Sequence, residues 1–303
     1  MSSSFSKDYI LAFFTAFIVT ILWSSSWVII KFGLKEISPL IFAAFRYSIA
    51  SIILLVLIFT NKSHRKSLYQ KSKKWYVMML VYGLIFITST QGGQFIALSL
   101  LPAITVSFIL NLTPYIVIFY SIPFLKEIPS RKDFIFFSFA FIGVLIYFIP
   151  SGLTILTFNG ILIGFFLLNT NALSSILGRI INREGSSSPL LITGISMSSG
   201  TLILVLIAII WEGIPSFSPL VILMILWLAI INTALAFTLW NKAMQKLRAM
   251  DITMINGTML PQIVLLSIIF LNEFPQTHEW IGLIILIFAT FAIQFIQAKK
   301  NSN

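Results

Sequence analysis

The 303-residue sequence contains no cysteine. Disulfide frameworks, thiolate nucleophiles, cysteine-based zinc sites and iron–sulfur clusters are therefore excluded. Histidine is almost as scarce, because only His64 and His278 occur, and neither belongs to a metal-binding pairing such as HExxH. We expect both to be solvated loop residues. We predict that the chain has no metal, no cofactor and no catalytic residue, and that it is not an enzyme.

Charged residues are also rare, at 10% of the chain, whereas hydrophobic residues make up 58% and the mean hydropathy is +1.00. Soluble proteins carry roughly 25% charged residues, so this composition excludes a water-soluble domain. Apolar runs long enough to cross a bilayer as a helix, about 20 residues, recur between short polar breaks. Ten runs occur, at 10–30, 39–60, 75–97, 103–125, 134–149, 157–178, 189–210, 219–241, 251–271 and 280–297. We predict an all-α polytopic membrane protein with ten transmembrane helices.

The positions of Lys and Arg predict the orientation of these helices. If the N-terminus is cytoplasmic, all but three of the 20 basic residues fall on the cytoplasmic side, including six in the 61–74 loop. The exceptions are Lys31 and Lys35 on the outer side and Arg46 within the second run. This asymmetry predicts a multi-pass protein of the cell (inner or plasma) membrane with both termini in the cytoplasm. The net charge of +11 is then explained by the orientation signal and by contact of basic loops with anionic lipid headgroups. We predict no nucleic-acid partner.

The two halves of the sequence are related by ordered matches. The alanine, proline, glutamate and proline of the segment Ala97–Pro129 recur in the same order in Ala243–Pro275, and Ser38-Pro39-Leu40 recurs as Ser188-Pro189-Leu190. The offsets lie between 146 and 150 residues, which indicates a duplication. Each half holds five helices, an odd number, so the second half must enter the membrane upside down. We predict two inverted five-helix repeats, residues 1–150 and 151–303.

These features resemble the EamA-type branch of the drug/metabolite transporter superfamily, which includes the YddG-like amino-acid exporters. The matching segments are LWSSSWVIIK in the first run, SPLIFAAFR at the start of the second, and the paired Pro…Glu segments in runs four and nine. The resemblance extends over nearly the whole chain. It implies a ten-helix carrier with a central cavity lined mainly by helices 1, 3, 4, 6, 8 and 9, and it implies export of amino acids or related metabolites.

Pro114 and Pro261 lie near the centres of runs four and nine. Proline removes a helical hydrogen bond and frees the carbonyl four residues earlier, at Leu110 and Gly257. Within hydrocarbon such a carbonyl needs a partner or a water-filled cavity. Midplane breaks at matching positions of inverted halves indicate a transport site, so we predict that both prolines are hinges. The alternative is a pair of kinks that only shape helix packing.

Polar and aromatic side chains gather near these breaks at helical spacing. Asn111 and Tyr115, for example, are four residues apart and are expected to share one face. Because buried amides, hydroxyls and indoles are costly in lipid unless paired, they should face one another or water. Each alone could equally be an interhelical contact. As a set we predict that they bind substrate, and the candidates are Trp23, Ser26, Trp27, Gln91, Gln94, Asn111, Tyr115, Asn171, Trp240 and Gln262.

Acidic residues are confined to helix ends and loops, so no carboxylate within a run is available to carry a proton or sodium ion. Glu127 and Glu273 precede the starts of the fifth and tenth runs, and we expect them to stabilise those helix N-termini. Arg46 is the one charged side chain well inside a run. It could pair with an anionic substrate, or it could snorkel or bond to a neighbouring helix.

Three functional classes are compatible with such a chain. An intramembrane enzyme would need a nucleophile–base pair, a metal cluster or phosphate-binding arginines, and the runs show none. A channel would show charged rings or a repeated filter sequence, which are also absent. A secondary transporter of small polar or amphipathic metabolites, with amino acids the expected substrates, explains the inverted repeat and the charge-poor polar cluster together. We predict export by alternating access between the two halves.

Overall fold

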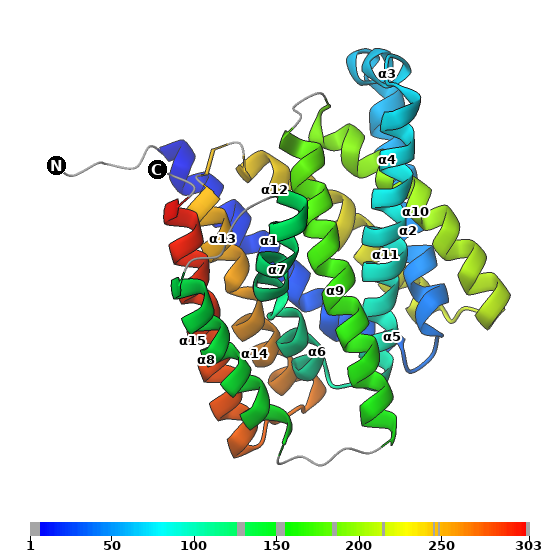
Figure 1. The fold of residues 1–303 in the computed structure, drawn as a ribbon. Helices are drawn as coiled ribbons and strands as arrows, with labels where there is room; N and C mark the ends of the chain where they lie inside the picture. The colour runs from blue at the N-terminus through cyan, green and yellow to red at the C-terminus, as the bar shows by residue number, and fades with distance from the viewer. Residues whose placement is uncertain are drawn as a thin grey trace.

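The computed structural model describes the chain apart from residues 1–6, 126–130, 150–154, 184–186, 214–215, 245, 248 and 301–303. Side chains are also left undescribed at 125, 131–133, 155–157, 182–183, 241, 249–250, 252–253 and 296–300. The described residues form helices and connecting turns with no strand (Figure 1). The predicted boundary at 150 and the side chain of Glu127 lie outside this part of the chain.

The first half of the chain contains α1 (Lys7–Gly33), α2 (Pro39–Thr60), α3 (Lys62–Tyr69), α4 (Lys73–Gly83), η1 (Leu84–Gln91), α5 (Gly92–Leu100), α6 (Ala103–Leu110), α7 (Thr113–Leu125) and α8 (Arg131–Phe148). The second half contains α9 (Ile155–Arg183), α10 (Pro189–Glu212), α11 (Pro219–Ala229), η2 (Ile230–Leu235), α12 (Ala236–Met244), α13 (Ala249–Gly257), α14 (Met259–Leu271) and α15 (Thr277–Lys300). Every predicted apolar run is helical over most of its length, which confirms the all-α expectation.

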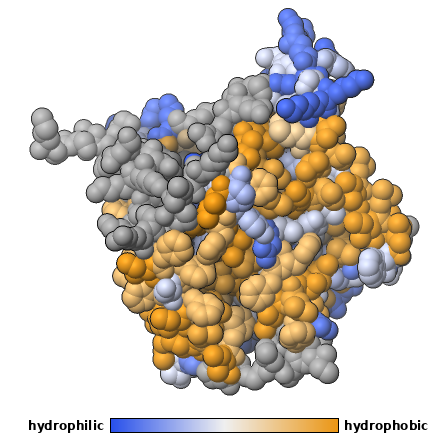
Figure 2. Space-filling view, in the orientation of Figure 1, coloured by the Kyte–Doolittle hydropathy of each residue, from blue (hydrophilic) through white to orange (hydrophobic). Residues whose placement is uncertain are grey.

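Within the described residues, nine helical stretches are long and apolar enough to cross a membrane, and α8 adds a shorter apolar stretch, Phe134–Phe148, packed along α15. Lipid-facing sides are evident in α10, where Leu202, Leu206 and Ile210 are 62–82% exposed while Leu204 and Ala208 are fully buried. Hydrophobic residues cover the flank of the molecule in Figure 2, and hydrophilic residues gather at the end that carries α3. This distribution fits a helix bundle with lipid as its lateral solvent.

Two spans contain a π-helical segment at matching positions. η1 begins at Leu84 in the third span and η2 begins at Ile230 in the eighth. In each segment a threonine hydroxyl donates to the carbonyl five residues earlier, Thr90 to Ile85 and Thr233 to Leu228, both at 2.8 Å. π-helical segments frequently occur at functional sites because they change which side chains face inward.

Spans four and nine are interrupted next to their prolines. α6 ends at Leu110 and α7 starts at Thr113, while α13 ends at Gly257 and α14 starts at Met259. Both prolines therefore lie in the first turn of the second piece, where the missing N–H costs little. The freed Leu110 carbonyl accepts a hydrogen bond from the Thr113 hydroxyl at 2.5 Å. Whether these breaks act as hinges stays a prediction.

The basic 61–74 segment is not a plain loop. Asn61 caps α3, because its Oδ1 accepts from the N–H groups of Ser63 at 2.9 Å and His64 at 3.3 Å. His64 lies in α3 with Nδ1 3.3 Å from the Ser188 hydroxyl, and His278 lies in the first turn of α15. The expectation of two loop histidines was wrong, because Asn61 caps a short helix that contains His64, and α15 begins at Thr277, one residue before His278.

Candidate functional site

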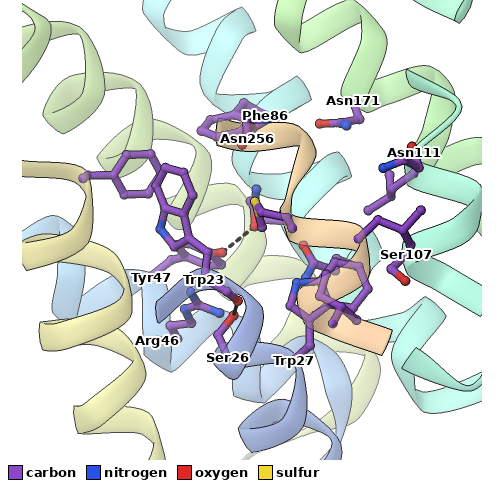
Figure 3. A pocket seen from close by; sticks show the side chains of 17 residues that line it. Trp23, Ser26, Trp27, Arg46, Tyr47, Phe86, Ser107, Asn111, Asn171 and Asn256 are labelled. Carbon is purple, nitrogen blue, oxygen red and sulfur yellow. Dashed lines mark hydrogen bonds between the residues drawn. The ribbon is translucent and has the colours of Figure 1, made fainter. Parts of the chain in front are cut away.

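A cavity of about 350 Å³ lies among helices from both halves of the chain. Figure 3 shows Trp23, Arg46 and Tyr47 on one side, and Ser107, Asn111 and Asn171 on the opposite side. Its walls come from α1, α2, η1, α5 and α6 of the first half, and from α9, α12, α13 and α14 of the second. All the spans that the resemblance implied contribute, together with α2.

Seven of the ten candidate substrate-binding residues line this cavity: Trp23, Ser26, Trp27, Gln91, Gln94, Asn111 and Asn171. They bring four amide groups and two indole rings to the cavity lining. Asn171 also supports the break in span four, since its Nδ2 donates to the Thr113 hydroxyl at 2.9 Å. The Gln91 amide oxygen accepts from the Tyr47 hydroxyl at 2.6 Å, which fixes both side chains at the cavity edge.

Tyr115 and Gln262 do not line the cavity. Tyr115 is 1% exposed and its ring centroid lies 6.2 Å from that of Phe137, so it packs toward α8. The expected shared face with Asn111 assumed a continuous helix, and the turn between α6 and α7 separates the two residues. The Gln262 amide is used between α1 and α14, where it accepts from Ser24 at 2.9 Å and donates to Thr20 at 3.1 Å.

Several lining residues were not among the candidates, namely Arg46, Tyr47, Phe86, Ser107, Leu110, Phe237, Asn256, Met259, Leu260 and Ile263. Asn256 lies directly before the break in span nine, much as Asn111 lies at the break in span four. An asparagine beside each break was therefore the available sequence signal. The apolar members carry no such signal, because an inward-facing Leu cannot be told from a lipid-facing one by residue type.

Arg46 is buried, at 6% exposure, and it lines the cavity rather than reaching toward the membrane surface. Its Nε donates to the Thr233 hydroxyl of η2 at 3.1 Å. Its guanidinium carbon lies 5.2 Å from the ring centroid of Tyr47 and 5.9 Å from that of Phe95. The interhelical bond considered from the sequence is therefore present, and snorkelling is not.

Aromatic side chains lie where this cavity meets a second one. The Trp23 ring centroid lies 5.0 Å from that of Trp240 and 5.4 Å from that of Phe237. Trp23, Phe86 and Phe237 line both cavities, while the candidate Trp240 lines only the second, whose volume is about 470 Å³. This second cavity also touches Arg179 and the start of α10, so it lies toward the α3 end of the bundle.

The opposite end is closed by polar contacts between helix ends. The Glu273 carboxylate accepts from the N–H groups of Ala103 at 3.0 Å and Ile104 at 3.2 Å, so it caps α6. We had expected it to stabilise the N-terminus of the helix that follows it, and that expectation was wrong. A left-handed residue, Asn272, with φ 54°, ends α14 and turns the chain there. Lys31 Nζ donates to the carbonyl of Leu98 at 3.0 Å, and lies 4.0 Å from Glu273.

A second carboxylate caps a helix at the same end. Glu212, the last residue of α10, accepts from the N–H groups of Leu40 at 3.2 Å and Ile41 at 2.9 Å in the first turn of α2. The Ser218 hydroxyl donates to Glu36 at 2.6 Å nearby. Negative charge at a helix N-terminus is favourable, and the pairing fastens the two halves together at this end.

Comparison with known proteins agrees with this architecture. The sequence matches the EamA-like transporter family at residues 10–149 and again at residues 155–295. An uncharacterized transporter of Archaeoglobus fulgidus is 24% identical over 275 residues, covering 88% of this chain and 91% of that protein. The uncharacterized transporter YyaM of Bacillus subtilis is 24% identical over 226 residues, 72% of each chain.

A solved crystal structure superposes with a TM-score of 0.65 at 17% identity, covering 95% of this chain and 98% of the other, and this likeness concerns the fold. The family match spans both halves, each carrying one copy of the repeat, and therefore covers nearly all of the sequence. The chain belongs to the EamA-like transporter family, as a multi-pass helical membrane protein built from two copies of that family's unit.

Proposed function

We propose that the protein is a secondary transporter of small polar or amphipathic metabolites that works by alternating access between its two halves. The observation that carries the proposal is the cavity of about 350 Å³, which is lined by amide and aromatic side chains from both repeats. Metabolite-binding cavities combine apolar walls with a few placed polar groups, and this size is at the small end of their range. Rocking of the halves about such a site would expose it to one side at a time.

The contacts at the two ends of the bundle support a conformation in which the central cavity opens toward the α3 end. A second cavity, which shares the lining residues Trp23, Phe86 and Phe237 with the central one, lies in that direction, whereas Glu212 and Glu273 fasten the opposite end. The basic segment 61–74 lies at the α3 end, and we propose that this end faces the cytoplasm and contacts anionic lipid headgroups. The structure then corresponds to an inward-facing state. A channel would need a path open at both ends, which the fastened helix ends oppose.

Amino acids are the substrate class that we propose first, with export as the direction. Amides such as Asn111 and Gln94 suit the polar ends of a zwitterion, and the faces of Trp23 and Trp27 suit an apolar side chain or an ammonium group. The family resemblance supports the same class. The YddG-like subtype within the family stays a prediction.

Counterflow in proteoliposomes tests the proposal. Vesicles loaded with one unlabelled amino acid should take up the same labelled amino acid faster than empty vesicles or vesicles without protein. A panel that covers the common amino acids would find the substrate, and a thermal-shift screen would rank binders, since a ligand stabilises by RT ln(1 + [L]/Kd). If the rate of uptake were the same with and without internal amino acid for every member of the panel, the proposal of an amino-acid carrier would be contradicted.

A further inference from the structure

Arg46 is the only ionisable side chain of formal charge among the described residues that line the central cavity. No Asp, Glu, Lys or His shares that lining, and no described carboxylate lies within 4.0 Å of the guanidinium. An unpaired cation in the membrane interior costs about 3 kcal/mol or more. Because the unpaired Arg46 guanidinium lies at the cavity wall, an anion that enters the cavity could pair with it and offset this cost.

The contacts of Arg46 hold the side chain in place without neutralising it. Nε donates to the Thr233 hydroxyl at 3.1 Å, and that hydroxyl donates onward to the Leu228 carbonyl at 2.8 Å. The rings of Tyr47 and Phe95 lie against the guanidinium. None of these groups carries a negative charge. The two terminal nitrogens make no hydrogen bond with a described residue, and they form the edge that pairs with a carboxylate through two parallel bonds.

The repeat offers a reason to regard this arginine as functional. Arg46 lies seven residues after Pro39, and the matching position after Pro189 is Ser196. The Ser196 hydroxyl simply donates to the Ile192 carbonyl of its own helix at 2.7 Å. Helix packing at this position therefore needs only a small side chain that bonds to its own helix. Of the two matching positions, the one in the first half alone carries a charged side chain, Arg46.

We propose that Arg46 binds a carboxylate of the transported substrate, so that the site selects carboxylate-bearing metabolites and rejects amines that lack a carboxylate. The inference rests on the proposed carrier function and narrows its substrate class. One guanidinium matches one negative charge, whereas a phosphate monoester carries roughly −1.5 to −2 at neutral pH and would stay partly uncompensated. The neighbouring Trp23 and Trp27 add an aromatic flank for an apolar substituent.

Three compounds of similar size test this proposal with the purified full-length protein: the anion 3-phenylpropionate, the neutral amide 3-phenylpropionamide and the cation phenethylamine. By thermal shift or tryptophan fluorescence, the parent protein should bind 3-phenylpropionate most tightly and phenethylamine least. In Arg46→Gln the affinity for 3-phenylpropionate should fall about tenfold or more. The affinity for the neutral amide should change little, which shows that the cavity is intact. Arg46→Lys, which keeps the charge but loses the paired nitrogens, should be intermediate.

Similar affinities of the parent for all three compounds, or no binding of 3-phenylpropionate, would overturn the inference. An Arg46→Gln protein that still prefers the carboxylate would also overturn it. If Arg46→Gln does not fold, the parent and Arg46→Lys measurements still decide the matter. Counterflow of a substrate without a carboxylate would refute the inference while the carrier function stands. Absence of counterflow for every substrate would instead refute the carrier.

Discussion

Glu273 accepts a hydrogen bond from the backbone N–H of Ala103 at 3.0 Å, so the end of α14 caps the start of α6. The contact joins the second repeat to the first across 170 residues of sequence, at the end of the bundle that we propose to face outward. An outward-facing state requires these helix ends to separate. The same carboxylate therefore favours the state seen here.

Glu273→Gln should weaken this closure, because a neutral amide has one acceptor oxygen and no charge for the helix N-terminus. Losing one charge-assisted hydrogen bond shifts the equilibrium about tenfold toward the open state. A cysteine introduced at Ser26 in the cavity should then react faster with an impermeant thiol reagent from outside. Glu279→Gln is the control, since Glu279 caps its own helix by accepting from the Gln276 N–H at 2.7 Å. Equal labelling rates for both variants would refute the role of Glu273.

Asn111→Leu should lower substrate affinity about tenfold or more, because it replaces a cavity-lining amide with an apolar side chain of similar size. Stability should be unchanged or slightly higher, since the Asn111 Oδ1 is buried without a hydrogen-bond partner among the described residues. Binding and thermal unfolding of the purified protein measure both effects.

A suitable control for that substitution is Asn169→Leu, on the exposed side of α9. Asn169 accepts from the Tyr120 hydroxyl at 2.7 Å and lies outside the cavity, so its loss should leave substrate affinity unchanged. Asn61→Leu would be a poor control, because Asn61 caps α3. If Asn111→Leu bound substrate as well as the parent protein, Asn111 would not belong to the site.

Gly200→Ala should destabilise the protein by about 1–3 kcal/mol through overpacking. A Cβ at Gly200 would lie 2.2 Å from the Gly83 carbonyl oxygen, so α4 and α10 would have to separate. Unfolding in a mild detergent measures the change. Gly93→Ala should be tolerated, because its Cβ would make only ordinary van der Waals contacts, with Leu167 Cδ1 at 3.8 Å and Phe166 Cε1 at 4.0 Å. Equal stability of the two variants would refute the close approach of α4 and α10.

Transport should need no proton gradient, because the described lining of the cavity contains no carboxylate to carry a proton. Proteoliposomes that perform counterflow should accumulate nothing when given a pH gradient without a substrate gradient. The counterflow activity of the same vesicles serves as the control. Uphill uptake under those conditions would refute uniport or exchange and would direct attention to Glu273.

The proposed orientation is open to cysteine labelling, since the native chain has none. A cysteine at the exposed Ser63 of α3 should be protected from an impermeant reagent in intact cells. One at the exposed Gln276, between α14 and α15, should react from outside. The reverse pattern would place α3 and the basic segment on the outer side.

The sequence by itself determined the fold class, the approximate positions of the helices and the two related halves. Bilayer thickness sets helix length, and a polar residue interrupts an apolar run visibly, so these features need no tertiary information. Charge placement likewise predicted an orientation. Seven of the ten candidate binding residues line one cavity. Exposure of a polar side chain to lipid is costly, so polar residues within spans face the interior of the bundle.

Only the tertiary structure decided which polar residues bind one another and which remain facing the cavity. Helical spacing placed Tyr115 beside Asn111, but the break between α6 and α7 turned Tyr115 toward Phe137. The π-helical η2 brought Thr233 to Arg46, and Glu273 reached α6 across the molecule. Such pairings depend on where distant helices meet. A buried polar atom bonds to the partner that helix packing places within hydrogen-bonding distance, and the order of residues along the chain does not specify that partner.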